Sequence, residues 1–190
     1  MVYEQKKLQP ENPFRVEVLR KDMYGALLID EFVDNLLWML EPPRACPVDI
    51  LRVHESKYFS DLEEKVEAVG EGKIRRLDCD TVISTASWEA AMYAVGSVTY
   101  AVDQVLKGNV RNAFCLIRPP GHHAGPTGAV VPDHDKQQTS NGFCLFNNIA
   151  IGAAYAKCVY RKDCLLYPSD APDEDEHVIL ATSPLAPQSR

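Results

Sequence analysis

A long helical pattern that leads directly into a short apolar run is the feature that most constrains the fold. From Ser87 to Gly108, apolar residues recur at the spacing of one helix face, and Ser87 is placed to cap the start. Residues 112–118, NAFCLIR, are nearly continuously apolar, which is typical of a buried strand. Pro119-Pro120-Gly121 ends this strand. A helix followed by a buried strand indicates an α/β fold with a parallel sheet.

Three further segments have helical patterns. Residues 15–40 carry two adjacent apolar rows and predict a well-buried helix, which ends at Glu41-Pro42-Pro43 because proline excludes the preceding residue from helical geometry. Residues 57–69 predict a second helix that Ser56 would cap. Residues 147–160, NNIAIGAAYAKCVY, predict an Ala-rich helix packed against the sheet, which Asn147 and Asn148 would cap.

Composition and charge exclude several classes of protein. The 190 residues are 46% hydrophobic, so a packed core is expected rather than disorder. The net charge of -7 argues against direct nucleic-acid binding. It would suit a basic partner, although an average acidic protein has the same charge. No apolar run approaches the roughly 18 residues that cross a bilayer, so no membrane association is expected.

The cysteines and the N-terminus bear on cellular location. Six cysteines occur at irregular spacings with no C-x-x-C pair, which excludes a zinc ribbon or a thioredoxin-like motif. Residues 1–13 contain no apolar segment of a signal peptide. We therefore expect an intracellular protein with reduced thiols, in the nucleus or the cytoplasm.

Two adjacent histidines, His122 and His123, follow the predicted strand at its carboxyl end. Ligands bind at that edge in open α/β sheets. The preceding prolines and glycine stiffen the loop, and rigid positioning is what general-base catalysis by an imidazole needs. Taken alone, however, such a pair is more often surface decoration or an incidental metal contact.

The surrounding motifs resemble the histone deacetylase family, in particular the N-terminal half of a class II-like catalytic domain. They comprise R-P-P-G-H-H-A at 118–124, G-F-C-x-F-N-N at 142–148, D-x-D-T at 78–81, and V-H-x-x-x-Y at 53–58. The resemblance covers roughly Leu51 to Ala156. It weakens upstream, where residues 9–13 resemble an H-P-E-x-P element whose histidine is replaced by Gln9.

The resemblance implies a fold, a chemistry and a set of site residues. The fold would be part of an arginase/deacetylase-like three-layer domain, with a parallel sheet flanked by helices. The family hydrolyses acyl-lysine with a zinc ion held by two aspartates and a histidine. His123 would be the general base, and His122 would stabilise the developing charge. Gly142 and Phe143 would line the acyl-lysine tunnel, and Cys144 would serve packing. An acetylated protein such as a histone tail, or an acetylated polyamine, would be the substrate.

The family's metal ligands are not found in this sequence. They lie on a strand after the Ala-rich helix, in D-x-D-x-H-H-G-N-G, and further on with a catalytic tyrosine. Residues 163–190 instead predict an irregular acidic, proline-rich tail after an incomplete domain at 1–162. Within the tail, Asp173, Asp175 and His177 have ligand-like spacing but are interpreted as a solvated loop. No metal ligand is therefore assigned, and zinc, the family's cofactor, is not expected to bind stoichiometrically.

Two other acidic clusters are interpreted structurally. Asp133, His134 and Asp135 predict a polar surface loop rather than a cation site. Asp78 and Asp80 predict a turn before the helix that starts near Ser87.

Three hypotheses follow. The chain is part of a lysine deacetylase-type hydrolase, or it is a non-catalytic relative that binds a protein partner covering the truncated sheet. The third is a product that does not fold stably, because a cut sheet leaves an edge strand and an apolar face uncovered.

Overall fold

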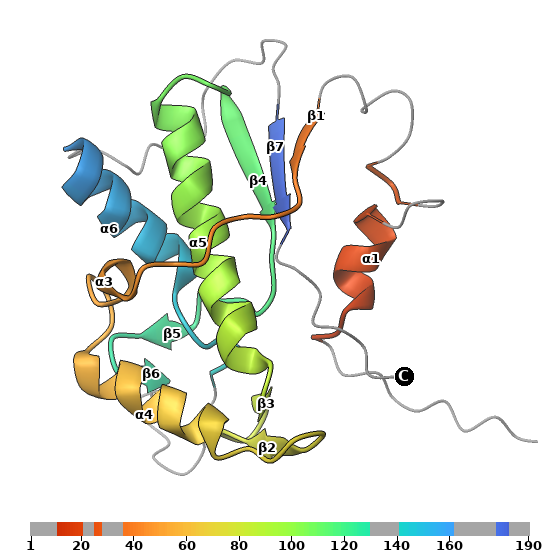
Figure 1. The fold of residues 1–190 in the computed structure, drawn as a ribbon, viewed down its shortest axis with the longest axis vertical. Coiled ribbons are helices and arrows are strands. Elements are labelled where there is room, and N and C mark those ends of the chain that lie inside the picture. The colour runs from red at the N-terminus through yellow and green to blue at the C-terminus, as the bar shows by residue number, and fades with distance from the viewer. Residues whose placement is uncertain (1–10, 21–24, 28–35, 130–140, 162–177, 183–190) are drawn as a thin grey trace, which may run out of the picture. The chain divides into compact units, whose positions relative to one another are not determined.

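The computed structural model describes residues 11–20, 25–27, 36–129, 141–161 and 178–182 (Figure 1). The chain divides into two compact units, Met1–Leu36 and Leu37–Arg190. No helix in the described ranges is long and apolar enough to cross a membrane.

Among its described residues, the first unit contains a short helix, α1 (Phe14–Arg20), whose first amide, Phe14 N, donates to Asn12 Oδ1 at 3.0 Å. The single helix predicted over residues 15–40 is wrong. The amide of Ala26 already bonds back to the carbonyl of Val18, and Leu36–Met39 forms a strand, β1. A short continuous apolar run such as LLWM fits a strand as well as a helix, so periodicity alone could not separate the two.

The helices that the structure describes in the second unit are α3 (Pro47–Ile50), α4 (Ser56–Glu67), α5 (Ser87–Leu106) and α6 (Asn148–Tyr160). The helices predicted over 57–69, 87–107 and 147–160 are confirmed. The predicted caps at Ser56 and Ser87 are wrong, because the cap positions fall on Glu55 and Ala86 and neither makes a side-chain cap bond. Ser87 instead accepts a hydrogen bond from Ser84 N at 2.9 Å.

The main sheet has the strand order β1-β7-β4. Strand β4 (Asn112–Leu116) pairs in parallel with β7 (Val178–Thr182), with Phe114 opposite Leu180. The parallel sheet is thus confirmed. The prediction of an irregular segment after residue 163 is wrong for 178–182, where VILAT is β-prone but was hidden by its acidic, proline-rich surroundings. β4 is also less buried than predicted, since Phe114 is 52% exposed.

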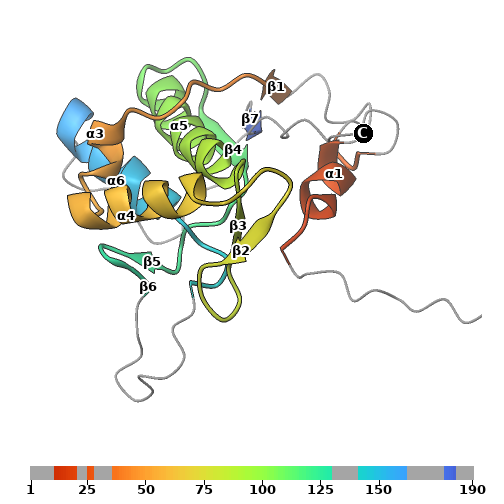
Figure 2. The same ribbon diagram turned by 60° about the horizontal axis from the view of Figure 1, so that its bottom comes forward.

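The described part of the second unit also contains two small hairpins. β2 (Ile74–Arg76) pairs antiparallel with β3 (Val82–Ser84), and β5 (Ala124–Gly125) pairs antiparallel with β6 (Gly128–Ala129). In Figure 1 the chain runs down β4 and continues into β5 and β6 beside α4, and Figure 2 shows the same hairpins from below.

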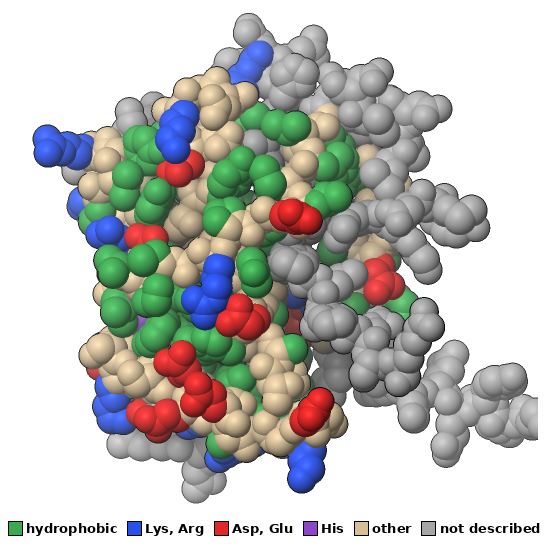
Figure 3. All heavy atoms as spheres, viewed as in Figure 1, with side chains coloured by type: hydrophobic (Ala, Val, Ile, Leu, Met, Phe, Trp, Pro, Cys, Tyr) green, Lys and Arg blue, Asp and Glu red, His purple; other side chains and the backbone are tan. Residues whose placement is uncertain are grey.

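The core is centred on aromatic rings beneath α4 and α5. Phe146 is 1% exposed and stacks on Phe59 at 5.8 Å between ring centroids, while Trp88 meets both rings edge-on. Phe146 belongs to the 142–148 motif, so the motif is tied into the core at this point. The surface is more polar around α4, where acidic side chains gather in the lower part of Figure 3.

Candidate active site

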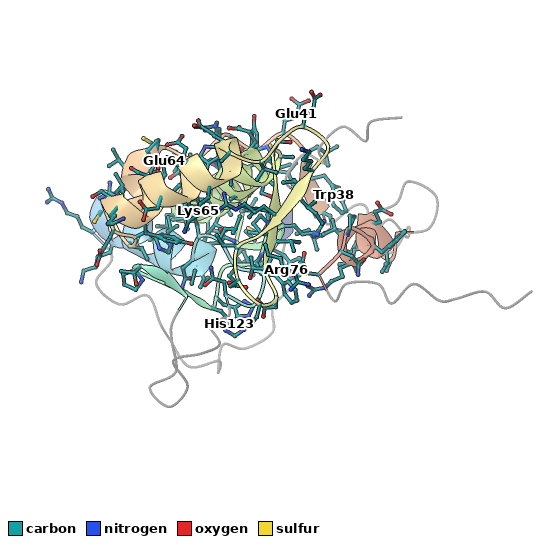
Figure 4. All side chains as sticks on the ribbon, turned by 90° about the horizontal axis from the view of Figure 1, so that it is seen from below. Trp38, Glu41, Glu64, Lys65, Arg76 and His123 are labelled. Atoms are coloured by element: carbon teal, nitrogen blue, oxygen red, sulfur yellow. The ribbon has the colours of Figure 1, made fainter. Side chains whose placement is uncertain are left out.

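The paired histidines lie on the loop that leaves the carboxyl end of β4, as predicted. Their ring centroids are 4.1 Å apart with the planes tilted by 59°, and both residues are exposed. Figure 4 shows His123 at the periphery of the described residues, with its side chain directed away from α4. Both imidazoles are therefore accessible from the same edge of the sheet.

Gly142 lies directly against His123. A Cβ atom at position 142 would stand 2.5 Å from Cδ2 of His123, so only glycine fits beneath this ring. Gly142 has φ +54° and Phe143 has φ +66°, so two consecutive residues adopt the left-handed conformation. The turn at 142–143 thus brings the second sequence motif against the first.

A second close approach joins the two motifs at Gly121. A Cβ there would overlap the carbonyl oxygen of Phe146 and approach Asn148 N to 2.6 Å. Asn148 Nδ2 donates to the carbonyl of Pro119 at 3.1 Å, so Asn148 joins the loops rather than capping the helix as predicted. Asn147 is the cap, and its Oδ1 accepts from Ala150 N at 3.1 Å.

A buried histidine and a half-buried tyrosine from the α3–α4 region hold the end of the second motif. His54 Nε2 accepts a hydrogen bond from Asn147 N at 2.9 Å, and the Tyr58 hydroxyl donates to the carbonyl of Leu145 at 2.7 Å. Burial lowers the pKa of His54, against the opposing effect of backbone groups of Gly125 and Pro126. Burial likewise raises the pKa of Tyr58 well above its ordinary value. The imidazole and the phenol are therefore held in their neutral forms.

The start of the second motif is held by the connection between β2 and β3. Asp78 Oδ1 accepts from the amides of Asp80 and Thr81 at 3.1 and 2.7 Å, which confirms the predicted turn role of Asp78. Its other oxygen accepts from Asn141 N at 2.9 Å, and Thr81 Oγ1 accepts from Phe143 N at 3.1 Å. The sequence pattern indicated the turn but not these contacts, which join residues about sixty positions apart.

The described residues do not form the metal site expected for the family. The His, Cys, Asp and Glu side chains that converge closely enough to hold an ion are Asp78, Cys79 and Asp80, and neither histidine of the pair belongs to this group. Both Asp78 oxygens already accept amide hydrogen bonds. Strand β7, which follows α6, has the sequence VILAT and offers no carboxylate or imidazole. Asp173, Asp175 and His177, and likewise Asp133, His134 and Asp135, lie outside the described residues.

Two cavities adjoin the site. A largely apolar cavity of about 660 Å³ runs along β4, α5 and α6 and reaches His122 and Gly121. A more polar cavity of about 400 Å³ lies between α4 and the turn region, with Tyr58, Asp78 and Asn141 in its wall. Cys144 is fully buried and its thiol contacts the carbonyl of Gly142 at 3.4 Å, in agreement with a packing role.

A strand of the parallel sheet leads to tandem histidines that lie against a glycine-led turn, and this arrangement fits a deacetylase-type domain. Residues 9–167 match the histone deacetylase domain family. The chain belongs to this family, which confirms the resemblance inferred from its motifs.

Individual relatives agree. The chain is 32% identical to histone deacetylase 8 of Arabidopsis thaliana over 77% of its own length and 34% of that protein. It is 40% identical to polyamine deacetylase HDAC10 of Danio rerio over 42% of its length and 10% of that protein. The crystal structure of the HDA15 HD domain superposes with a TM-score of 0.53 and 28% identity, covering 63% of this chain and 30% of that one. The chain thus spans about a third or less of these relatives, and its fold is part of a deacetylase fold.

Proposed function

We propose that this chain supplies the histidine side of a site for the hydrolysis of acyl-lysine amides. The single observation that carries the proposal is the contact between His123 and Gly142, which sets an accessible imidazole against a turn bearing an aromatic side chain. Membership of the histone deacetylase family supports deacetylase-type hydrolysis as the chemistry.

In this site His123 would remove a proton from the attacking water, and His122 would donate a hydrogen bond to the oxygen on which negative charge develops. The C–N bond of the amide then breaks, and the amine leaves after taking up a proton. Gly142 and Phe143 would bound the acyl-lysine side chain, with the phenyl ring against its methylene groups. The family is in general zinc-dependent, but the described residues do not form its ligand set.

An acylated, Lys-rich protein segment such as a histone tail is the substrate class that the charge supports best. The net charge of -7 attracts a basic segment over long range. A small acetylated polyamine is cationic too, and one relative is named a polyamine deacetylase. Side-by-side binding of an acetyl-lysine peptide and an acetylated polyamine would separate these substrates.

A second candidate function is non-catalytic binding of a protein partner. Phe114 on β4 is 52% exposed and Ile149 on α6 is 69% exposed, and both border the apolar cavity. Exposed apolar surface beside a cavity is typical of an interaction site.

The proposal is tested on the full chain by measuring binding and hydrolysis of an acetyl-lysine peptide, together with the bound zinc per chain. We expect the acetylated peptide to bind more tightly than the unmodified one. In His123→Ala we expect the affinity for the acetylated peptide to fall about tenfold or more, equivalent to about 1.4 kcal/mol. Glu67→Gln, an exposed change on α4, is the matched control. We expect well below one zinc per chain.

The outcomes separate the two functions. Zinc-dependent hydrolysis that disappears in His123→Ala supports the enzyme and contradicts the expected low zinc content. Selective binding without hydrolysis supports the acyl-lysine site in a non-catalytic protein. Equal affinity for acetylated and unmodified peptide contradicts the acyl-lysine site altogether.

A further inference from the structure

We propose that Asp78 and Thr81 are positioning residues that hold the Gly142–Phe143 turn against the His123 ring. The proposal rests on the proposed function only in the assignment of this turn to the acyl-lysine site. The hydrogen bonds of Asp78 and Thr81 go to the turn and to their own hairpin, not to the paired histidines. Both residues would therefore act through the turn and not on the substrate.

The two hydrogen bonds from Asp78 and Thr81 flank Gly142 on both sides. Asp78 accepts from the amide of Asn141, immediately before Gly142, and Thr81 accepts from the amide of Phe143, immediately after it. The two bonds therefore bracket Gly142, which lies against the His123 ring. A shift of either amide would change the distance between Gly142 and the imidazole.

The two hydrogen bonds hold the turn in a left-handed backbone conformation. Glycine adopts positive φ readily, but Phe143 at φ +66° carries a side chain that disfavours it. A non-glycine residue stays in this region only when its surroundings hold it there. The Thr81 hydroxyl satisfies the Phe143 amide in this conformation and so favours it over the extended alternative.

The Asp78 carboxylate and the Thr81 hydroxyl are themselves held in place by hydrogen bonds within their own hairpin. Asp78 Oδ1 is bound by the amides of Asp80 and Thr81, which leaves its other oxygen aimed at Asn141. Thr81 is 1% exposed, and its hydroxyl donates to Asp80 Oδ1 at 2.9 Å, so its lone pairs face the Phe143 amide. A backbone hydrogen bond from Leu77 N to the carbonyl of Thr81 at 2.8 Å joins the two ends of the β2–β3 connection.

The same segment is held further along by His54 at Asn147 and by Tyr58 at Leu145. Supports thus fall on alternate residues of the segment, from two different parts of the chain. His54 and Tyr58 lie at its core end, whereas Asp78 and Thr81 lie at the end that faces His123. Mutations can therefore change the hydrogen bonds at one end of the segment without changing those at the other.

The test is amide hydrogen exchange of the full chain, read residue by residue by NMR. Thr81→Val keeps the shape and removes the hydroxyl, and we expect exchange of the Phe143 amide to speed up about tenfold while the Asn147 amide is unchanged. Thr81→Ser keeps the hydroxyl and should stay within about threefold of the parent chain. Asp78→Ala should likewise speed up exchange of the Asn141 amide, and the control Glu67→Gln should leave the exchange of these amides unchanged.

Binding of an acetyl-lysine peptide supplies the second readout. We expect Thr81→Val to weaken binding several-fold and Thr81→Ser to restore it. If Thr81→Val and Asp78→Ala leave the exchange of both amides unchanged, the positioning role is overturned. If exchange responds but the parent chain shows no preference for the acetylated peptide, the positioning role stands and the proposed function fails. If Thr81→Val does not fold, the Asp78→Ala exchange data decide alone.

Discussion

At the scale of single residues, the state of His54 shows how an imidazole outside the paired motif serves the site. His54 is 2% exposed and lies 5.4 Å from the ring of Tyr58 and 5.5 Å from that of Phe146. Its Nε2 accepts a hydrogen bond from Asn147, which requires an unprotonated nitrogen. Protonation would break this bond and place a charge among aromatic rings.

The lowered pKa of His54 predicts a pH dependence of stability. In the unfolded chain the imidazole titrates near 6.5, and in the folded chain below that, so between the two values the unfolded state binds more protons. The His54 contribution is therefore fully present above pH 6.5 and is lost as the pH falls toward the folded pKa. Thermal unfolding should show a melting temperature that falls over this window.

His54→Gln is the matched variant for this prediction, because it keeps a hydrogen-bond acceptor and removes the titration. Its melting temperature should be lower than that of the parent chain at pH 7.5, but it should fall less as the pH is lowered from 6.5. An equally steep fall in the variant would show that another group causes the pH dependence.

The sequence was informative about some site residues and silent about others. The positions of His122, His123 and Gly142 followed from local motifs, because a strand end and a glycine-led turn are short-range features. The contact of Thr81 with Phe143 could not be predicted, since it depends on where a distant hairpin packs. Asn148 was misread as a cap because its side chain binds across to another loop.

At the scale of the elements, α5 is fixed by a close crossing at Gly96. The amide of Ala45 donates to the carbonyl of Met92 at 3.1 Å, which ties the 43–45 segment onto the helix. A Cβ at Gly96 would overlap the carbonyl oxygen of Pro43 and lie 2.8 Å from Ala45 N. Glycine, normally unfavourable within a helix, is required here by backbone contact.

Gly96→Ala should therefore destabilise the protein by about 2–4 kcal/mol, although alanine is the better helix former. Urea unfolding followed by circular dichroism measures this change. Gly70→Ala is the control, because its Cβ would meet only the flexible Lys73 side chain at 3.3 Å, and we expect a change within about 0.5 kcal/mol. A neutral or stabilising Gly96→Ala would contradict the close crossing.

The elements also show where patterns mislead. Helices with a clear apolar stripe, such as α4 and α5, were predicted nearly to the residue. Continuous apolar runs were not: LLWM became the strand β1 within a predicted helix, and VILAT became β7 within a segment expected to be irregular. Both strands gain stability from pairing with distant partners, which local pattern does not reveal.

At the scale of the whole molecule, the second unit brings the two sequence motifs together at the proposed acyl-lysine site. At Gly121 the backbone lies directly against the backbone of residues 146–148, and at Gly142 the backbone lies directly against the His123 ring. Such contacts tolerate no added methyl group, so the relative position of the loops is set by the backbone itself. The family's carboxylate ligands are not among the described residues, and the domain boundary near residue 162 stays a prediction.

The most direct test of this account is the nuclear Overhauser effect between the His123 ring and Gly142 in the full chain. A Cδ2 atom that lies within contact of a Cβ built on Gly142 requires a strong cross-peak between the Hδ2 proton of His123 and the Hα protons of Gly142. The account predicts this cross-peak at neutral pH. Its absence, with both resonances assigned and sharp, would place the imidazole away from the turn and contradict the proposed site.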